Sequence, residues 1–246
     1  MPVVTLCQLL NVENMKVEIW SDVICPFCYI GKHNFEKALA QFADKDKVEV
    51  VWKSFQLDSS MPDVANESYE QYLVKRKGLS VEKVRAMLHN VTQMASQSGL
   101  EYHLDRSVMV NSLHAHRLIQ YAKLHQKGDE AEERLFEAFF TRGENIADPS
   151  TLISIAVEIG LDEAAVQDAL SNQQYSFEVN RDIQEARAIG VSGVPFFVFN
   201  RKYAISGAQP PQVILETLQK SYSEWQPVSI VEVQDGQSCG VDGRCE

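Results

Sequence analysis

Two cysteines separated by two residues give this chain a direct route to redox chemistry. Cys25 and Cys28 frame Pro26 and Phe27, and cysteines at this spacing can cycle between a dithiol and a disulfide. The thiolate is the reacting form of a cysteine, and a helix N-terminus favours it through unpaired backbone N–H groups and the helix dipole. We expect Cys25 to be the nucleophile and Cys28 to resolve the mixed disulfide.

The elements around the pair place it where this chemistry is favoured. Residues 16–20 alternate apolar and polar side chains, which is typical of a strand, and 26–42 repeat apolar side chains at helical spacing. Pro26 suits the first position of that helix, because its missing N–H has no partner to lose there. Cys25 therefore lies at a strand-to-helix junction, and Cys28, one turn further on, is expected to be the less exposed cysteine.

Two other uses of the pair stay open, a structural zinc site and inert packing. Zinc would need a second closely spaced pair of ligands. His114 and His116 point to nearly opposite sides of a predicted helix and make poor joint ligands, so we expect no resident metal and expect these histidines to be satisfied or solvent-facing. Trp20 and Asp22 lie close to the cysteines and are expected to support them structurally.

Composition argues against several classes of partner. The chain has 246 residues, 45% of them hydrophobic, which suits one large domain or a domain that carries an insertion. A net charge of −11 without a basic cluster disfavours nucleic acid and anionic membrane surfaces. No apolar run reaches the roughly 18 residues that span a bilayer, and residues 1–14 lack the features of a secretory signal. We expect a cytoplasmic protein.

The predicted order of elements is strand–helix–strand, a long helical stretch, and a hairpin followed by a helix. A second strand is predicted over 47–57, parallel to the first through a right-handed crossover. Strands over 195–199 and 202–206 flank Asn200-Arg201 as a tight turn. Within the helical stretch, one helix is predicted to begin at Asp129.

Glu132 lies three residues after Asp129, at the spacing of a capping box. The other helices of the stretch are predicted over 67–77, 81–98, 111–127, 149–160, 163–170 and 176–189.

These elements predict an α/β protein with a large all-helical insertion. Residues 15–60 and 175–225 form the domain around a mixed sheet, and residues 61–174 form the inserted helical domain. The pattern dissolves beyond 225, so residues 226–246 are predicted to be a flexible C-terminal tail.

The tail carries Cys239 and Cys245, with glycines between them that would ease closure of a small disulfide. We hypothesise a second redox pair that exchanges with Cys25 and Cys28. An inert tail and a four-thiolate metal site are the alternatives. Cys7, near the start of the chain, is assigned no role.

The arrangement resembles the thioredoxin fold, and the helical insertion between its halves resembles the DsbA family. Three segments are similar to the FrnE-type cytoplasmic branch of that family: residues 21–31 around the cysteines, Ala115-His116-Arg117-Leu118, and residues 193–197. The resemblance covers roughly residues 15–225. It implies a dithiol–disulfide oxidoreductase.

The resemblance further implies a cis peptide bond between Val194 and Pro195, packed against the cysteine pair. Pro195 would then belong to the catalytic site, and Val194, Pro26 and Phe27 would contact the substrate. Strongly oxidising DsbA proteins typically have Pro-His between the two cysteines, and this chain departs from that pattern. Because Phe27 stands where those proteins have an imidazole, extreme oxidising power is not expected.

The same branch is similar to 2-hydroxychromene-2-carboxylate isomerases and kappa-class glutathione transferases, which carry serine where Cys25 stands. Disulfide exchange requires a full dithiol and that isomerisation does not. We therefore expect a cytoplasmic thiol–disulfide oxidoreductase or isomerase, monomeric or homodimeric, that acts on disulfide-containing proteins or small thiols. It needs no organic cofactor, and glutathione is a candidate redox partner. The alternatives are a glutathione-dependent isomerase or transferase of a small aromatic compound, and a holdase-like binding module.

Overall fold

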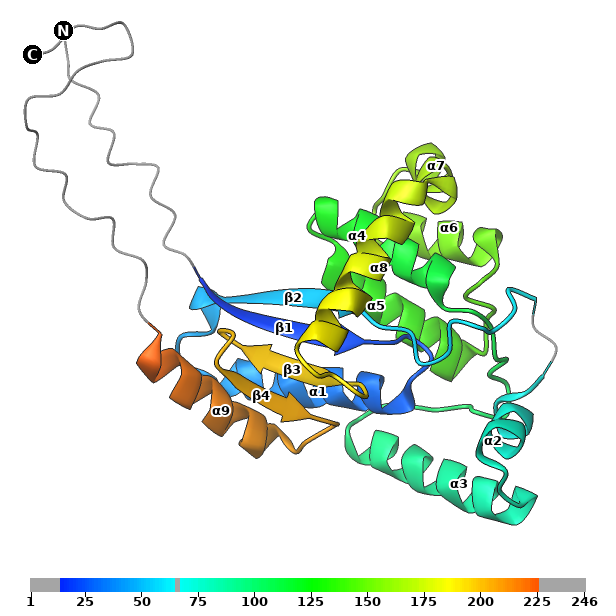
Figure 1. The fold of residues 1–246 in the computed structure, drawn as a ribbon, viewed down its shortest axis with the longest axis horizontal. Helices are drawn as coiled ribbons and strands as arrows, with labels where there is room; N and C mark the ends of the chain where they lie inside the picture. The colour runs from blue at the N-terminus through cyan, green and yellow to red at the C-terminus, as the bar shows by residue number, and fades with distance from the viewer. Residues whose placement is uncertain (1–13, 65–66, 226–246) are drawn as a thin grey trace, which may run out of the picture.

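The computed structural model describes residues 14–64 and 67–225. Its centre is a four-stranded sheet in the order β2-β1-β3-β4 (Figure 1). β1 pairs parallel with β2 and antiparallel with β3, and β3 pairs antiparallel with β4. The two ends of the described chain therefore meet in one mixed sheet, as predicted. The strands are β1 (Met15–Ser21), β2 (Val48–Ser54), β3 (Phe196–Phe199) and β4 (Tyr203–Ser206).

Side chains alternate between the two faces of the sheet along each strand. Helices cover both faces. Ile19 of β1 packs with apolar residues of α1 (Pro26–Gln41) and α9 (Pro211–Glu224) on one face. Trp20 packs on the other face against α8 (Gln173–Ala188). This alternation is the pattern that identified the first strand in the sequence.

The hairpin turn between β3 and β4 is the tight turn predicted at Asn200-Arg201. Both residues have positive φ, 48° and 53°. The Lys202 backbone N–H donates to the Phe199 carbonyl at 3.0 Å across these two residues, and positive φ at both of them suits the twist of the flanking strands. The turn thus fixes the register in which β3 and β4 pair.

A helical insertion lies between β2 and α8 (Figure 1). Asp148 and Pro149 begin α6 and Asp162 caps α7, as predicted. The chain continues from α5 into a π-helix, Glu137–Arg142. The remaining bounds are α2 (Tyr69–Lys77), α3 (Val81–Gln97), α4 (Leu113–Leu124), α5 (Gly128–Phe136), α6 (Pro149–Glu158) and α7 (Glu163–Ser171).

The predicted capping box at the start of α5 is wrong. The N-cap residue is Lys127, and Asp129 lies inside the first turn. The Asp129 carboxylate accepts a hydrogen bond from Trp52 Nε1 at 2.9 Å, while Glu132 is only 1% exposed. A tertiary hydrogen bond therefore engages Asp129, and Glu132 lies buried in the interior, so neither carboxylate caps the helix.

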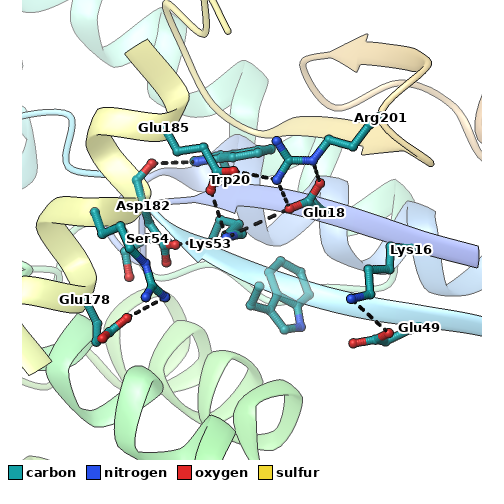
Figure 2. A network of polar contacts seen from close by, with 12 residues as sticks. Lys16, Glu18, Trp20, Glu49, Lys53, Ser54, Glu178, Asp182, Glu185 and Arg201 are labelled. Atoms are coloured by element: carbon teal, nitrogen blue, oxygen red, sulfur yellow. Dashed lines mark hydrogen bonds and ion pairs between the residues drawn. The ribbon is translucent and has the colours of Figure 1, made fainter. Parts of the chain in front are cut away.

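A buried carboxylate ties α8 to the sheet (Figure 2). Asp182 accepts hydrogen bonds from Lys53 Nζ and from the Ser54 backbone N–H, both at 3.1 Å. The indole of Trp20 donates to the Asp182 backbone carbonyl at 2.9 Å. Because α8 leads into β3, these bonds fix the helix from which the chain returns to the sheet.

Charged side chains extend this network to the hairpin turn. Arg201 pairs with Glu18 of β1 and with Glu185 of α8. Lys53 of β2 also pairs with Glu185, at 2.9 Å (Figure 2). One set of ion pairs therefore joins two strands, the hairpin turn and α8.

We predict that Asp182→Ala lowers the free energy of unfolding by about 3 kcal/mol, because Lys53 and the Ser54 amide lose their buried acceptor. Urea unfolding followed by circular dichroism measures the change. Asp168→Ala, an exposed position on α7, is the control and should change stability by less than about 0.5 kcal/mol. Equal losses in the two variants would contradict the role assigned to Asp182.

Candidate active site

The cysteine pair lies at the start of α1. Cys25 is the N-cap residue and Pro26 follows at the first helical position. The Cys25 backbone N–H donates to the Asp22 carbonyl at 2.9 Å, and the Cys28 N–H donates to the Cys25 carbonyl at 3.0 Å. The predicted strand-to-helix junction is confirmed, and it places Cys25 beside the unpaired amides of the helix end.

Both cysteines are buried, and the more exposed side chain is the phenylalanine between them. Cys25 is 4% exposed, Cys28 1% and Phe27 42%. The predicted order of exposure between the cysteines holds, although the difference is small. Phe27 is therefore the residue of this segment that offers an exposed apolar surface.

A loop from the far end of the chain covers Cys25. The peptide bond between Val194 and Pro195 is cis, as the resemblance implied. The Cys25 Sγ lies 3.6 Å from the Val194 carbonyl oxygen, across 169 positions of sequence. The structure thus brings together Cys25, Cys28, Val194 and Pro195.

A glycine allows α1 to approach this loop. A Cβ at Gly31 would lie 2.8 Å from Pro195 Cγ and 3.3 Å from Phe197 Cζ. Real Cβ atoms do not approach other carbons so closely, so α1 and the Pro195 loop can touch only at a residue without a side chain. Gly31 therefore sets the distance between the two halves of the site.

Two tyrosines from the insertion hold the first turn of α1, and sequence reasoning missed both. The Tyr102 hydroxyl donates to the Pro26 carbonyl at 2.6 Å, and the Tyr69 hydroxyl donates to the Ile24 carbonyl at 3.4 Å. Burial raises the pKa of both hydroxyls well above the ordinary value, so they remain donors at neutral pH. No local pattern marks such residues.

The π-helix positions the segment that carries Tyr102. The Phe140 carbonyl accepts from the His103 backbone N–H, and the Phe139 carbonyl accepts from the Ser107 hydroxyl, both at 2.7 Å. π-Helical turns leave carbonyls free for such contacts and are common near functional sites. These two carbonyls thus hold the segment from which Tyr102 reaches the first turn of α1.

Burial dominates the acidity of the inner cysteine. It raises the pKa of the Cys28 thiol well above the ordinary value, and the hydrogen bond and charge of Cys25 add to the rise. The Asp22 backbone amide lowers this pKa, whereas the Asp22 carboxylate charge raises it. Cys28 is therefore a thiol at neutral pH and must lose a proton before it can attack a disulfide.

Three ionisable residues, Asp22, His116 and Glu132, are buried in the interior. Asp22 and His116 are fully buried and Glu132 is 1% exposed. His116 Nε2 lies 3.4 Å from Asp22 Oδ1. His114, two residues earlier, instead lies near the surface, 3.7 Å from Asp63. The prediction that the histidines form no joint pair is consistent with this placement, but the interior position of His116 was missed.

Burial and neighbouring charges together shift the pKa values of Glu132 and His116. Burial raises the pKa of Glu132 to about 7, against the opposing charges of His116 and Lys32. Burial alone would lower the pKa of His116, but Asp22 and Glu132 outweigh it and raise that pKa. Glu132 is therefore the member of this group whose pKa lies near neutral pH.

A separate cluster around Lys32 is well compensated. The buried Lys32 ammonium contacts Glu133 at 2.9 Å and Asp129 at 3.5 Å, and it also pairs with Glu36. Burial alone would raise the pKa of Glu133, but the hydrogen bond from His33 and the charge of Lys32 lower it to about 2. His33, Glu36 and Glu133 could together offer three ligand atoms to a cation, yet Lys32 already serves these carboxylates as counter-ion.

Some predicted features lie outside the residues that the structure describes. Cys7, Cys239 and Cys245 are among them, and so is the predicted tail over 226–246. Within residues 14–64 and 67–225, no helix combines the length and apolar character needed to cross a bilayer.

A mixed sheet, a dithiol at the start of its first helix and a cis-proline loop above the dithiol define a thioredoxin-like protein. The DSBA-like thioredoxin domain matches residues 16–219, and the chain belongs to that family. The chain is also 30% identical over 187 residues to the uncharacterized protein YwbO of Bacillus subtilis, which covers 74% of this chain and 85% of YwbO.

Solved structures share this fold. The probable DsbA oxidoreductase SCO1869 from Streptomyces coelicolor is 36% identical, with a TM-score of 0.84 over 95% of this chain and 99% of that chain. The cytosolic disulfide reductase DsbM from Pseudomonas aeruginosa is 16% identical, with a TM-score of 0.61 over 85% and 98%. A 2-hydroxychromene-2-carboxylate isomerase is also 16% identical, with a TM-score of 0.64 over 85% and 96%.

We predict that Gly31→Ala lowers the free energy of unfolding by about 1–3 kcal/mol and speeds alkylation of Cys25, because the added methyl pushes Pro195 away and uncovers the thiol. Urea unfolding and the rate of alkylation by iodoacetamide measure the two effects. Gly193→Ala is a matched control on the facing loop, since a Cβ there meets nothing within 4 Å. Similar behaviour of the two variants would contradict the assigned contact.

We predict that Glu132→Gln stabilises the protein at alkaline pH. The folded state holds the Glu132 proton up to a pKa of about 7, against 4.5 for an ordinary glutamate. The wild type therefore loses stability as pH rises from 4.5 through 7, by roughly 3 kcal/mol, and the glutamine variant does not. Unfolding curves at pH 5 and pH 9 measure the difference. Glu216→Gln, exposed on α9, should show no such trend, and a pH-independent effect of Glu132→Gln would refute the assignment.

Proposed function

We propose that this protein is a thiol–disulfide oxidoreductase whose nucleophile is Cys25 and whose resolving cysteine is Cys28. The observation that carries the proposal is the position of Cys25. Its sulfur stands at the N-terminus of α1 and 3.6 Å from the Val194 carbonyl, and Cys28 follows one turn later. Disulfide exchange needs an attacking thiolate and a second cysteine close enough to resolve the mixed disulfide. Cys25 and Cys28 are placed for these two steps.

The reaction has two exchanges. The Cys25 thiolate attacks one sulfur of a substrate disulfide, forms a mixed disulfide and expels the other substrate sulfur as a thiolate. Cys28 then loses its proton and attacks Cys25, which releases the second substrate thiolate and leaves a Cys25–Cys28 disulfide. The substrate is reduced, the protein is oxidised, and an external thiol must reduce the pair again.

The surroundings of Cys25 suit a bound disulfide. The Val194–Pro195 segment lies directly against Cys25 and offers its backbone to an extended substrate. Phe27 is 42% exposed and supplies an apolar surface on the other side, next to Pro26. These residues would position the substrate strand while Cys25 reacts.

We place the protein in the FrnE-like branch and in the cytoplasm, where it would reduce or isomerise aberrant disulfides. The three segments that resemble that branch support the assignment. The Pro-Phe dipeptide provides no imidazole between the cysteines, which favours a moderate potential. Against a reducing cytosolic poise, a dithiol of moderate potential acts as a reductant or isomerase, with glutathione as a suitable redox partner.

The test is the reduction of insulin disulfides with dithiothreitol as the reductant. We expect the wild type to accelerate the reaction and Cys25→Ser to fall to background, because the attacking sulfur is lost. Cys28→Ser should lose most turnover and accumulate a mixed disulfide that mass spectrometry can detect. Cys7→Ser is the matched control and should retain activity.

Two results would refute the proposal. Activity that survives in Cys25→Ser would show that the reaction does not use this thiol. A wild type that is no faster than dithiothreitol alone would remove disulfide exchange as the function and favour chemistry on a small molecule.

A further inference from the structure

Asn34, on α1, contacts both the helical insertion and the segment that leaves the sheet. It lies three residues after Gly31 and is 8% exposed. Its Nδ2 donates to the Gln209 carbonyl at 3.0 Å, and its Oδ1 accepts from the Ser98 hydroxyl at 3.2 Å. One buried side chain on α1 therefore joins two segments that are far apart in sequence.

The orientation of the Asn34 amide follows from these two partners. A backbone carbonyl can only accept a hydrogen bond, so the NH₂ group must face Gln209. The side-chain oxygen then faces Ser98, whose hydroxyl is the donor. Each end of the amide has a partner, and the loss of either partner leaves a polar group unsatisfied in a largely buried place.

Ser98 is a fixed point of the insertion. It caps α3, and its backbone carbonyl accepts from Lys37 Nζ at 2.8 Å, so α1 holds both its backbone and its side chain. Four residues later, Tyr102 donates to the Pro26 carbonyl at 2.6 Å. The segment 98–102 is therefore bound to α1 at both of its ends.

The other partner of Asn34 leads to the loop that covers Cys25. The Gln209 backbone N–H donates to the Gly207 carbonyl at 3.0 Å, and the Gly207 N–H donates to the Pro195 carbonyl at 2.8 Å. α9 begins directly after this turn and packs beside α1, as α3 does (Figure 1). An unbroken series of hydrogen bonds thus runs from the end of α3 through Asn34 to Pro195.

We propose that Asn34 is a positioning residue that holds the Val194–Pro195 segment in the place where a peptide disulfide binds. This inference rests on the function proposed above. Gly31 permits the close contact between α1 and Pro195, and Asn34 maintains it. Because the segment offers its backbone to an extended substrate, Asn34 acts on the binding of peptides. A small disulfide without a peptide backbone does not need this contact.

Two variants interrupt the series of hydrogen bonds on different sides of Asn34. Asn34→Asp keeps an acceptor for Ser98 but turns a carboxylate oxygen towards the Gln209 carbonyl, which loses its donor. Ser98→Ala keeps the bond to Gln209 and removes the link to the insertion. Asn180→Asp is the matched control, because Asn180 is exposed on α8 and its amide donates only within that helix, to the Ser176 carbonyl at 2.9 Å.

The experiment compares a peptide disulfide with a small disulfide. The reference protein is the full-length chain with Cys7, Cys239 and Cys245 replaced by serine. The first substrate is a pair of short peptides joined by one disulfide, with a fluorophore and a quencher, reduced in the presence of dithiothreitol to give KM and kcat. The second is 4,4′-dithiodipyridine, whose reaction with the reduced protein releases a coloured thione. Circular dichroism confirms that each variant is folded under the assay conditions.

We expect Asn34→Asp to raise KM for the peptide disulfide by roughly tenfold, the contribution of one hydrogen bond, and to change kcat by less than about twofold. Its reaction with 4,4′-dithiodipyridine should not slow, because a looser Val194–Pro195 segment leaves the Cys25 thiol more accessible. Ser98→Ala should raise the same KM by roughly threefold, since the bond to Gln209 remains. Asn180→Asp should match the reference protein.

A merely structural contact would lower the free energy of unfolding and leave KM unchanged, so an unchanged KM in Asn34→Asp overturns the inference. An equal loss with both disulfides also overturns it, because the effect would then lie on the Cys25 thiol. If Asn34→Asp does not fold, Ser98→Ala decides alone, and an unchanged KM there has the same meaning. A reference protein that does not reduce the peptide disulfide would instead refute the proposed function, so the two failures are distinguishable.

Discussion

The hydrogen bond from the Tyr102 hydroxyl to the Pro26 carbonyl holds the helical insertion against the first turn of α1. It is 2.6 Å long, and Tyr102 is 6% exposed, so water cannot easily replace it. The ring of Tyr102 stacks on Tyr29 and Phe140, with centroids 6.0 and 4.7 Å away. The geometry of the thiol pair therefore depends on a contact between the sheet-forming part of the chain and the insertion.

Ionisable residues are also buried in this part of the protein, and they occur in two different environments. Around Lys32, three carboxylates share one buried ammonium as their counter-ion. His116 Nε2 instead faces Asp22 Oδ1 at 3.4 Å, and among the described residues the buried Glu132 carboxylate oxygens have no hydrogen-bond partner. A buried charge that is left without a partner costs more stability than one that is paired and hydrogen-bonded. The two clusters flank α5, so the same helix contributes to both.

The sheet and the position of the dithiol could be predicted because their signals are local. Alternation marks β1, Pro26 marks the start of α1, and Asn200-Arg201 marks the hairpin turn. Family resemblance added the cis bond before Pro195, which no spacing rule reveals. Asp129 and Glu132 show the opposite case: their spacing satisfies a capping box, but contacts with distant residues such as Trp52 override it.

The rest of the site could not be predicted because its signals are tertiary. Residues Ala115 to Ala122 of α4 are all buried, so the helix has no polar face that would distinguish an interior His116 from a solvent-facing one. Tyr69 and Tyr102 are ordinary aromatic residues in sequence, and only the fold directs their hydroxyls to backbone carbonyls near Cys25. The role of such residues can be recognised only in the folded structure, where the insertion packs on α1.

The separation of 169 residues between Cys25 and Val194 has a consequence for the protein during its own synthesis. Translation proceeds at about 5–20 residues per second, so Cys25 leaves the ribosome roughly 10–30 s before the loop that will cover it. Throughout that interval the dithiol exists without its lid and without the last strands of the sheet. The nascent chain therefore carries two uncovered thiols for an interval that overlaps the seconds-to-hours range in which disulfides form.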